Sequence, residues 1–324
     1  MTSQSKRWVK GLFLCFLALL IIHPRAAAFD KKSSYALSHY IMAVMYDDLG
    51  QIDKAIEEYK AALKADSKSS AIHLNLAVSY LKNSNFTEAT KELDSVIKLD
   101  PDAVEPHAIL ALLYAAQNKT DLATSEYELA LKNASKLEPK NVNIYKTLGL
   151  IYLRQKNLQA AEGTYNLILK LSPNDAEAHF YLGSVYFESK NRDKAVVELK
   201  KALELKPDYA EALNYLGYLY VEENKNLEQA ELMIKKALEI DPNNGAYVDS
   251  LGWLYFRKGK VQEAIKELEK ASGLLEDPAI HEHLGEAYFK IGDIEKAKIS
   301  WQNSLKLDSN QEKIKDKLEK LNKK

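Results

Sequence analysis

The chain has 324 residues, with 45 basic and 46 acidic side chains, a formal net charge of −1 and a hydrophobic fraction of 46%. This balance argues against a nucleic-acid partner, because nucleic-acid-binding proteins carry a basic face. The length alone would allow two domains, and the composition is ordinary for a soluble helical protein.

The first 28 residues have the layout of a secretory signal peptide. Basic residues at the start precede an uninterrupted apolar run, Gly11–Ile22, and Ala26–Ala28 forms an A-x-A cleavage signature before Phe29. This run is shorter than the roughly 20 residues of a membrane span. We therefore predict cleavage, export and a periplasmic location; secretion and an uncleaved N-terminal anchor are the alternatives, and membrane association is expected only if the segment is retained. Cleavage would remove the only cysteine, Cys15, so no disulfide is expected.

Eight tyrosines are regularly spaced along the rest of the chain, and we call them the ruler tyrosines. They are Tyr46, Tyr80, Tyr114, Tyr152, Tyr186, Tyr220, Tyr255 and Tyr288, separated by 34, 34, 38, 34, 34, 35 and 33 residues. A near-constant period of this size indicates repeated supersecondary units. Such chains bind partners along an extended surface.

Other residue types recur at fixed distances from the ruler tyrosines. Three positions earlier lies a small residue: Ala43, Ala77, Ala111, Gly149, Gly183, Gly217, Gly252 or Gly285. Nine positions later, or ten in the sixth repeat, lies an alanine: Ala55, Ala89, Ala123, Ala161, Ala195, Ala230, Ala264 or Ala297. Because residues three or four apart share a helix face, the small residue and the tyrosine lie on one helix, and the alanine belongs to a second. Gly50, Gly259 and Gly292 suit the left-handed turn between these helices.

This pattern resembles the tetratricopeptide repeat (TPR), most clearly in AEAHFYLGSVYFESKNRDKAVVELKKALELKPDY, residues 176–209. The resemblance implies an all-α fold, a right-handed superhelical α-solenoid of about eight TPR helix-turn-helix units with a C-terminal capping helix. After a short segment, 29–35, the expected repeats are 36–69, 70–103, 104–141, 142–175, 176–209, 210–244, 245–277 and 278–311, followed by a cap helix over 312–324. The third repeat carries four extra residues near Lys136, and the sixth carries one near Lys225. The unbroken series predicts one continuous superhelix.

No motif in the chain indicates catalysis or a cofactor. Phosphate-binding loops, dinucleotide fingerprints and nucleophile elbows are missing from the sequence. Five histidines share one position, seven residues before a ruler tyrosine: His39, His73, His107, His179 and His281. Equivalent positions in consecutive repeats lie too far apart to share a metal ion. We expect these histidines to pack between the two helices of each unit, and we expect neither a metal nor an enzyme.

The TPR resemblance also predicts a binding groove, because the first helix of each pair lines the concave face in that family. The candidate groove residues are Leu112, Lys146, Leu150, Phe180, Asn214, Tyr218, Asp249, Trp253, Glu282 and Glu286. Phe180, Tyr218 and Trp253 would form an exposed aromatic patch beside an acidic end, and large exposed apolar groups indicate a binding surface. The alternative is that some of these rings pack against neighbouring repeats.

Two stretches, ALNYLGY from Ala212 and DSLGW from Asp249, are similar to bacterial envelope TPR proteins, some of which are adaptors. We therefore expect an exported, non-catalytic scaffold or adaptor that binds a protein or peptide segment in its groove. A self-assembling structural scaffold is the first alternative. A glycan-binding receptor is the second, because aromatic rings can stack on sugars.

Overall fold

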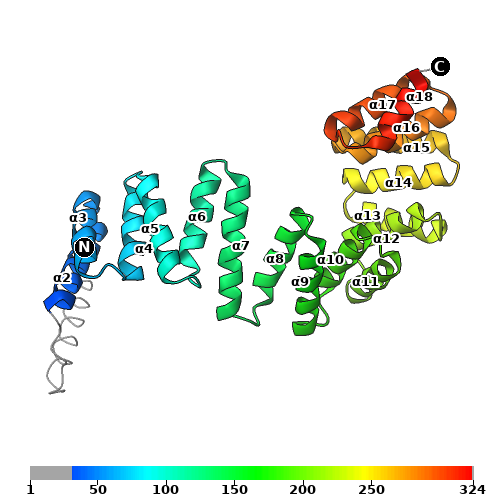
Figure 1. Ribbon diagram of the computed structural model, residues 1–324. Coiled ribbons are helices and arrows are strands. Elements are labelled where there is room, and N and C mark those ends of the chain that lie inside the picture. Colours follow the sequence, from blue (N-terminus) through cyan, green and yellow to red (C-terminus); the bar gives the residue numbers. More distant parts are fainter. Residues whose placement is uncertain (1–30, 323–324) are drawn as a thin grey trace, which may run out of the picture. The chain divides into compact units, whose positions relative to one another are not determined.

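The computed structural model describes residues 31–322, and every regular element in that range is an α-helix. The predicted signal peptide lies outside the described residues. None of the described helices is both long and apolar enough to cross a membrane. The helices alternate as pairs, and we call the first member of each pair an A helix and the second a B helix (Figure 1).

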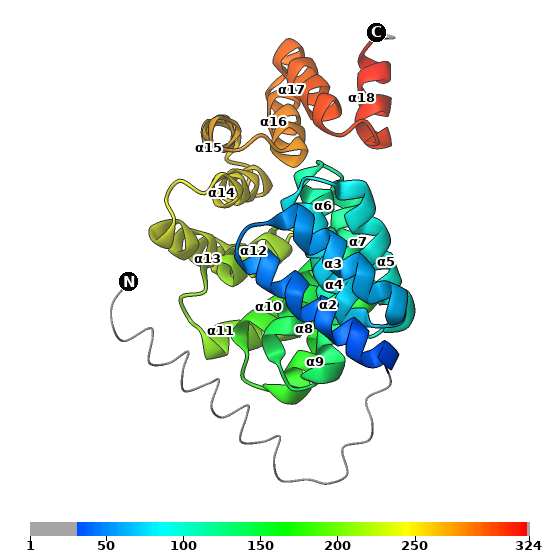
Figure 2. The same ribbon diagram turned by 90° about the vertical axis from the view of Figure 1, so that its left-hand side faces the viewer.

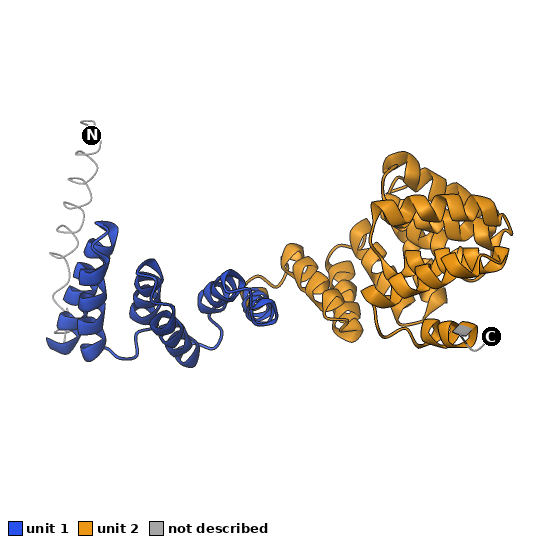
Figure 3. Ribbon diagram, turned by 90° about the horizontal axis from the view of Figure 1, so that it is seen from above, with its two compact units in different colours: residues 1–134 blue, residues 135–324 orange. Residues whose placement is uncertain are grey.

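The chain divides into two compact units at residues 134/135, within the last turn of α7 (Figure 3). The first unit holds three A helices and three B helices. The A helices are α2 (Lys31–Asp48), α4 (Ser70–Lys82) and α6 (Glu105–Ala116), and the B helices are α3 (Ile52–Ala65), α5 (Phe86–Leu99) and α7 (Thr120–Leu137).

The second unit holds five helix pairs and a final single helix. The A helices are α8 (Val142–Arg154), α10 (Ala176–Glu188), α12 (Ala210–Glu222), α14 (Gly245–Arg257) and α16 (Pro278–Ile291). The B helices are α9 (Leu158–Leu171), α11 (Arg192–Leu205), α13 (Leu227–Ile240), α15 (Val261–Leu274) and α17 (Ile294–Leu307). The last helix, α18 (Glu312–Asn322), inserts Ile314 into the core beside Trp301 and lies next to α16 and α17 (Figures 1 and 2).

Each A–B turn contains a left-handed residue four positions after the ruler tyrosine. The positive φ angles fall at Gly50, Ser84, Asn118, Lys156, Lys190, Asn224, Gly259 and Gly292. The expectation for the three glycines is confirmed. The other five turns tolerate a non-glycine residue in this conformation, at a cost of about 1–2 kcal/mol each.

The small residue of each repeat lets the A helix approach its B helix closely. A Cβ atom added to Gly285 would lie 2.4 Å from the Trp301 ring, and one added to Gly149 would lie 2.6 Å from the Tyr165 ring. Real Cβ atoms do not approach other atoms so closely, so glycine at these positions is required by packing.

The two insertions have different structural outcomes. The four extra residues of the third repeat lengthen α7 to 18 residues, whereas α5 and α9 have 14. The single extra residue of the sixth repeat stays in the turn, where Asn226 adds a second left-handed residue after Asn224. An insertion of about one helical turn keeps the same face inward, but a single residue would rotate it by about 100°.

Candidate functional site

Within each unit, successive A helices contact one another through a pair of recurring positions. The residue six before a ruler tyrosine meets the residue five before the next one. In the first unit the Nδ2 of Asn75 donates a hydrogen bond to the hydroxyl of Tyr40, at 2.8 Å. In the second unit the ring of Phe180 meets that of Tyr215 edge-on, 5.9 Å between centroids.

The same two positions form a buried ion pair between α14 and α16. His283 donates from Nδ1 to both carboxylate oxygens of Asp249, at 2.9 and 3.1 Å, and both side chains are buried. Burial by itself would lower the pKa of His283, but the charge and hydrogen bond of Asp249 outweigh it and raise that pKa. The pair therefore favours a protonated imidazolium inside the fold.

Trp253 completes this cluster and is covered on both faces. Its ring stacks on His283 at 4.2 Å and on Phe256 at 4.8 Å, and its Nε1 donates to the Glu222 carboxylate at 2.8 Å. Only 9% of Trp253 remains exposed. The expectation that this ring is free for a partner is wrong, because His283 from the next repeat occupies its face.

Phe180 is also part of the internal packing. It contacts the rings of Tyr181, Tyr209 and Tyr215, and 9% of it is exposed. For Phe180, too, the alternative interpretation is correct, because its ring packs against a neighbouring repeat. Tyr218 is half-buried and meets the rings of Phe187 and His283, at 6.4 and 6.3 Å between centroids; burial raises the pKa of its hydroxyl.

The predicted acidic end is largely neutralised by partners. Asp249 is held by His283, and Glu286 forms an ion pair with Lys317 of α18. Lys146, predicted as a cationic groove residue, bonds to Asp175 at 2.9 Å and Glu177 at 2.6 Å. The remaining predicted charged residue, Glu282 on α16, is half-buried.

Asn214 is the exception in this series of contacts. It occupies the position six before its ruler tyrosine and is 9% exposed, yet its Oδ1 has no hydrogen-bond partner within residues 31–322. The facing position in the next repeat is Ser250, whose hydroxyl donates to the Ala246 carbonyl of its own helix at 2.9 Å. A buried carbonyl oxygen is thus left on the A-helix side of the second unit.

The two predicted leucines are exposed. Leu112 on α6 is 72% accessible, and Leu150 on α8 is 44% accessible. Leu112 belongs to the first unit, whereas the other nine predicted residues belong to the second. Those nine lie along the A helices α8, α10, α12, α14 and α16.

Comparison with known proteins gives the family. Four models of tetratricopeptide repeats match, over residues 48–113, 183–223, 109–176 with 250–311, and 210–244. The chain belongs to the TPR family. No curated protein matches this sequence.

Solved structures agree with this family. A TPR protein from Parabacteroides merdae ATCC 43184 superposes with a TM-score of 0.58 at 19% identity, covering 77% of this chain and 97% of that one. The APC/C hetero-tetramer Cut9–Hcn1 gives 0.54 at 16% identity, covering 87% of this chain and 69% of that one. At these identities the likeness shows the fold alone, and it confirms the all-helical TPR solenoid.

The recurring histidines bond across the two helices of individual TPR units. His39, His73, His107 and His179 each place Nδ1 against a glutamate nineteen residues later: Glu58, Glu92, Glu126 and Glu198. The expectation that they pack between helices is confirmed for these four. The partner glutamates were not predicted, although their constant spacing of nineteen residues from the histidines is visible in the sequence.

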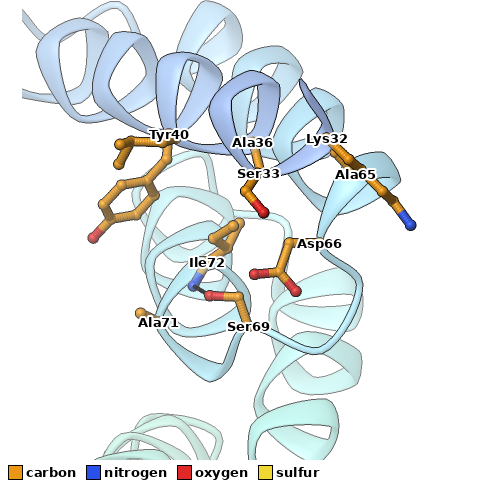
Figure 4. A pocket seen from close by; sticks show the side chains of 10 residues that line it. Lys32, Ser33, Ala36, Tyr40, Ala65, Asp66, Ser69, Ala71 and Ile72 are labelled. Carbon is orange, nitrogen blue, oxygen red and sulfur yellow. Dashed lines mark hydrogen bonds between the residues drawn. The ribbon is translucent and has the colours of Figure 1, made fainter. Parts of the chain in front are cut away.

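A cavity of about 510 Å³ lies in the first unit, between the start of α2 and the α3–α4 turn (Figure 4). Tyr40 and Ile72 form part of its wall. Its polar groups serve the turn itself: Ser69 Oγ accepts from the Ile72 N–H, and Asp66 accepts from the Lys68 N–H. These polar groups of the cavity wall are therefore already used within the turn.

Proposed function

We propose that this TPR protein is an exported, non-catalytic scaffold that binds an extended segment of a protein partner on the A-helix face of its second unit. TPR proteins of this kind are typically interaction scaffolds, which supports the general role. The observation that carries the specific proposal is the buried, unpaired Oδ1 of Asn214.

A buried acceptor without a partner costs about 1–3 kcal/mol. Because that oxygen has less than 1 Å² of accessible surface, the Asn214 side chain must rotate outward before a backbone N–H of an extended peptide can donate to it, and the new hydrogen bond would then recover that cost. The half-buried ring of Tyr218, one helical turn further along α12, supplies apolar contact beside it. Glu282 on α16 favours a basic side chain in the bound segment.

The buried rings take a different role from the one expected from sequence. Phe180 on α10 and Trp253 on α14 are held by neighbouring rings, so they stiffen the A helices before and after α12. A preorganised surface loses little side-chain entropy on binding. The covered faces of Trp253 also remove the basis for sugar stacking, so the glycan-receptor alternative has no support from this ring.

The binding site can be tested with an unbiased peptide library displayed against the purified protein. Peptides that are selected should be extended and carry a basic residue, and Asn214→Ala should weaken their binding about tenfold, as expected for one lost hydrogen bond. Asn303→Ala on the B helix α17 is the matched control and should bind normally. Unchanged affinity in Asn214→Ala would remove Asn214 from the site.

Export rests on the N-terminal segment and needs its own experiment. The mature protein recovered from the periplasm of a bacterial host should begin at Phe29. Recovery of the intact N-terminus from the membrane fraction would instead support the uncleaved anchor.

A further inference from the structure

The first helix of the solenoid has an apolar face that no helix of the described chain covers. Met42 occupies the position four before the first ruler tyrosine and is 41% exposed. Its equivalents are 0 to 8% exposed: Leu76, Leu110, Leu148, Leu182, Leu216, Leu251 and Leu284. Six of them lie on A helices that pack against the preceding B helix: Leu76, Leu110, Leu182, Leu216, Leu251 and Leu284. Helix α2 has no such neighbour among residues 31–322.

The uncovered face has the spacing of a helix–helix seam. Tyr35, Ser38, Met42 and Met45 follow one another at intervals of three, four and three residues, and Leu49, four residues later, lies in the turn directly after α2. This 3-4 alternation is the pattern by which two helices pack with side chains interlocked. Ile41 borders the same face, and the exposed apolar members are Tyr35, Ile41, Met42, Met45 and Leu49. The chemistry of the face therefore calls for another helix.

We propose that the occupant is α2 of a second copy of this chain, packed antiparallel to form a two-fold dimer. In one antiparallel register, Met42 lies opposite Ser38 of the second copy, so a large side chain faces a small one. In the same register Tyr35 lies opposite Met45. Ser38 is already satisfied, because its hydroxyl donates to the Tyr35 carbonyl at 2.9 Å. Burying it in the seam therefore leaves no unpaired donor.

The charges on α2 select this orientation. Lys31 stands at the beginning of the helix and Asp48 at its end, and neither has an ion pair within the described residues. In the antiparallel register each Lys31 lies next to Asp48 of the other copy. A parallel pair would bring like charges together at both ends, which opposes association.

The size and position of the face indicate a closed, reversible dimer. Five side chains, each about half exposed, offer roughly 500 Å² per copy, so pairing would bury about 1,000 Å² in total, near the lower limit for a specific interface. The other end of the solenoid carries α18 over its last apolar face. Because the contact uses the same face on both copies, it closes at two copies and does not grow into a fibre.

Sedimentation equilibrium of the exported protein over a wide concentration range tests the dimer. The wild type should move from monomer to dimer as concentration rises, and Met45→Glu should raise the dimer dissociation constant at least about tenfold. Leu232→Glu is the control, because Leu232 is 72% exposed on the B helix α13 and lies outside this face. A wild type that stays monomeric throughout, or that forms higher assemblies, would overturn the proposal.

A charge exchange tests the antiparallel arrangement. Lys31→Glu and Asp48→Lys should each weaken the dimer, and the double variant should regain most of the wild-type affinity, because each new glutamate again faces a lysine. Failure of the double variant to recover affinity would overturn the antiparallel register. All four proteins should show the same helical circular dichroism, because both residues are exposed.

Discussion

The two units connect their A helices by different chemistry. In the first unit the contact is neutral, with Asn75 bonded to the Tyr40 hydroxyl, and it is supported at the surface by Lys82 and Asp47 at 2.5 Å. In the second unit the contacts are buried rings and the Asp249–His283 pair. An asparagine on the A-helix side of a repeat can therefore either bond within the fold or keep an unpaired atom. Asn75 donates a hydrogen bond to Tyr40, whereas the Oδ1 of Asn214 has no partner among the described residues.

The largest expected effect comes from breaking the buried pair of the second unit. Asp249→Ala would leave the His283 ring buried without its carboxylate partner and should destabilise the second unit by about 3–5 kcal/mol. Tryptophan fluorescence during urea unfolding measures this, because Trp253 and Trp301 both lie in the second unit. Asp47→Ala, which breaks the partly exposed pair of the first unit, is the comparison and should cost no more than about 1 kcal/mol; far-ultraviolet circular dichroism measures it, because residues 31–134 contain no tryptophan. Equal losses in the two variants would show that burial does not distinguish the units.

The same pair should make the second unit sensitive to pH in a defined direction. The pKa of His283 is raised in the folded state, where Asp249, Glu282 and Glu222 surround it. Its stabilising contribution is therefore complete below the unfolded pKa of about 6.5 and is lost as pH rises through the higher folded pKa. The urea midpoint seen by tryptophan fluorescence should fall across this window.

His283→Gln isolates this effect from other titrating groups. Every other titratable group is present in both proteins, so its contribution cancels in the difference between wild type and variant. The difference in midpoint should shrink as pH rises from 6 to 9. A constant difference would mean that the charge of His283 plays no part in the stability.

The sequence predicted the repeats well because they depend on local sterics. A small residue, a tyrosine and an alanine must recur for two helices to pack, so their period is visible in the chain. Exposure of Phe180 and Trp253 was predicted wrongly because it depends on residues in the next repeat, Tyr215 and His283. Nothing within a single repeat reveals that contact, but the six-before and five-before positions, compared across repeats, would have shown it.

The two asparagines give the most direct test of the comparison. Asn75→Ala removes a hydrogen bond to Tyr40 and should destabilise the first unit by about 1 kcal/mol. Asn214→Ala removes an unpaired acceptor and should leave stability unchanged or slightly increased. Urea unfolding followed by far-ultraviolet circular dichroism measures both. A loss for Asn214→Ala as large as that for Asn75→Ala would indicate that Asn214 has an internal partner in solution.

The smallest effect concerns a feature that the two units share, the left-handed residue of each A–B turn. Ser84 in the first unit and Lys190 in the second have φ angles of 57° and 61°. Replacing either residue with glycine relieves about 1–2 kcal/mol of backbone strain. Glycine also adds about 0.5–1 kcal/mol of backbone entropy to the unfolded chain, so the free energy of unfolding of each variant should rise by about 0.5 kcal/mol. Gly259→Ala makes the opposite change and should destabilise, although nothing lies within 4 Å of an added Cβ there. If Ser84→Gly and Lys190→Gly gave effects of opposite sign, the turns would not be equivalent, and the units would differ in their hairpins as well as in the contacts between A helices.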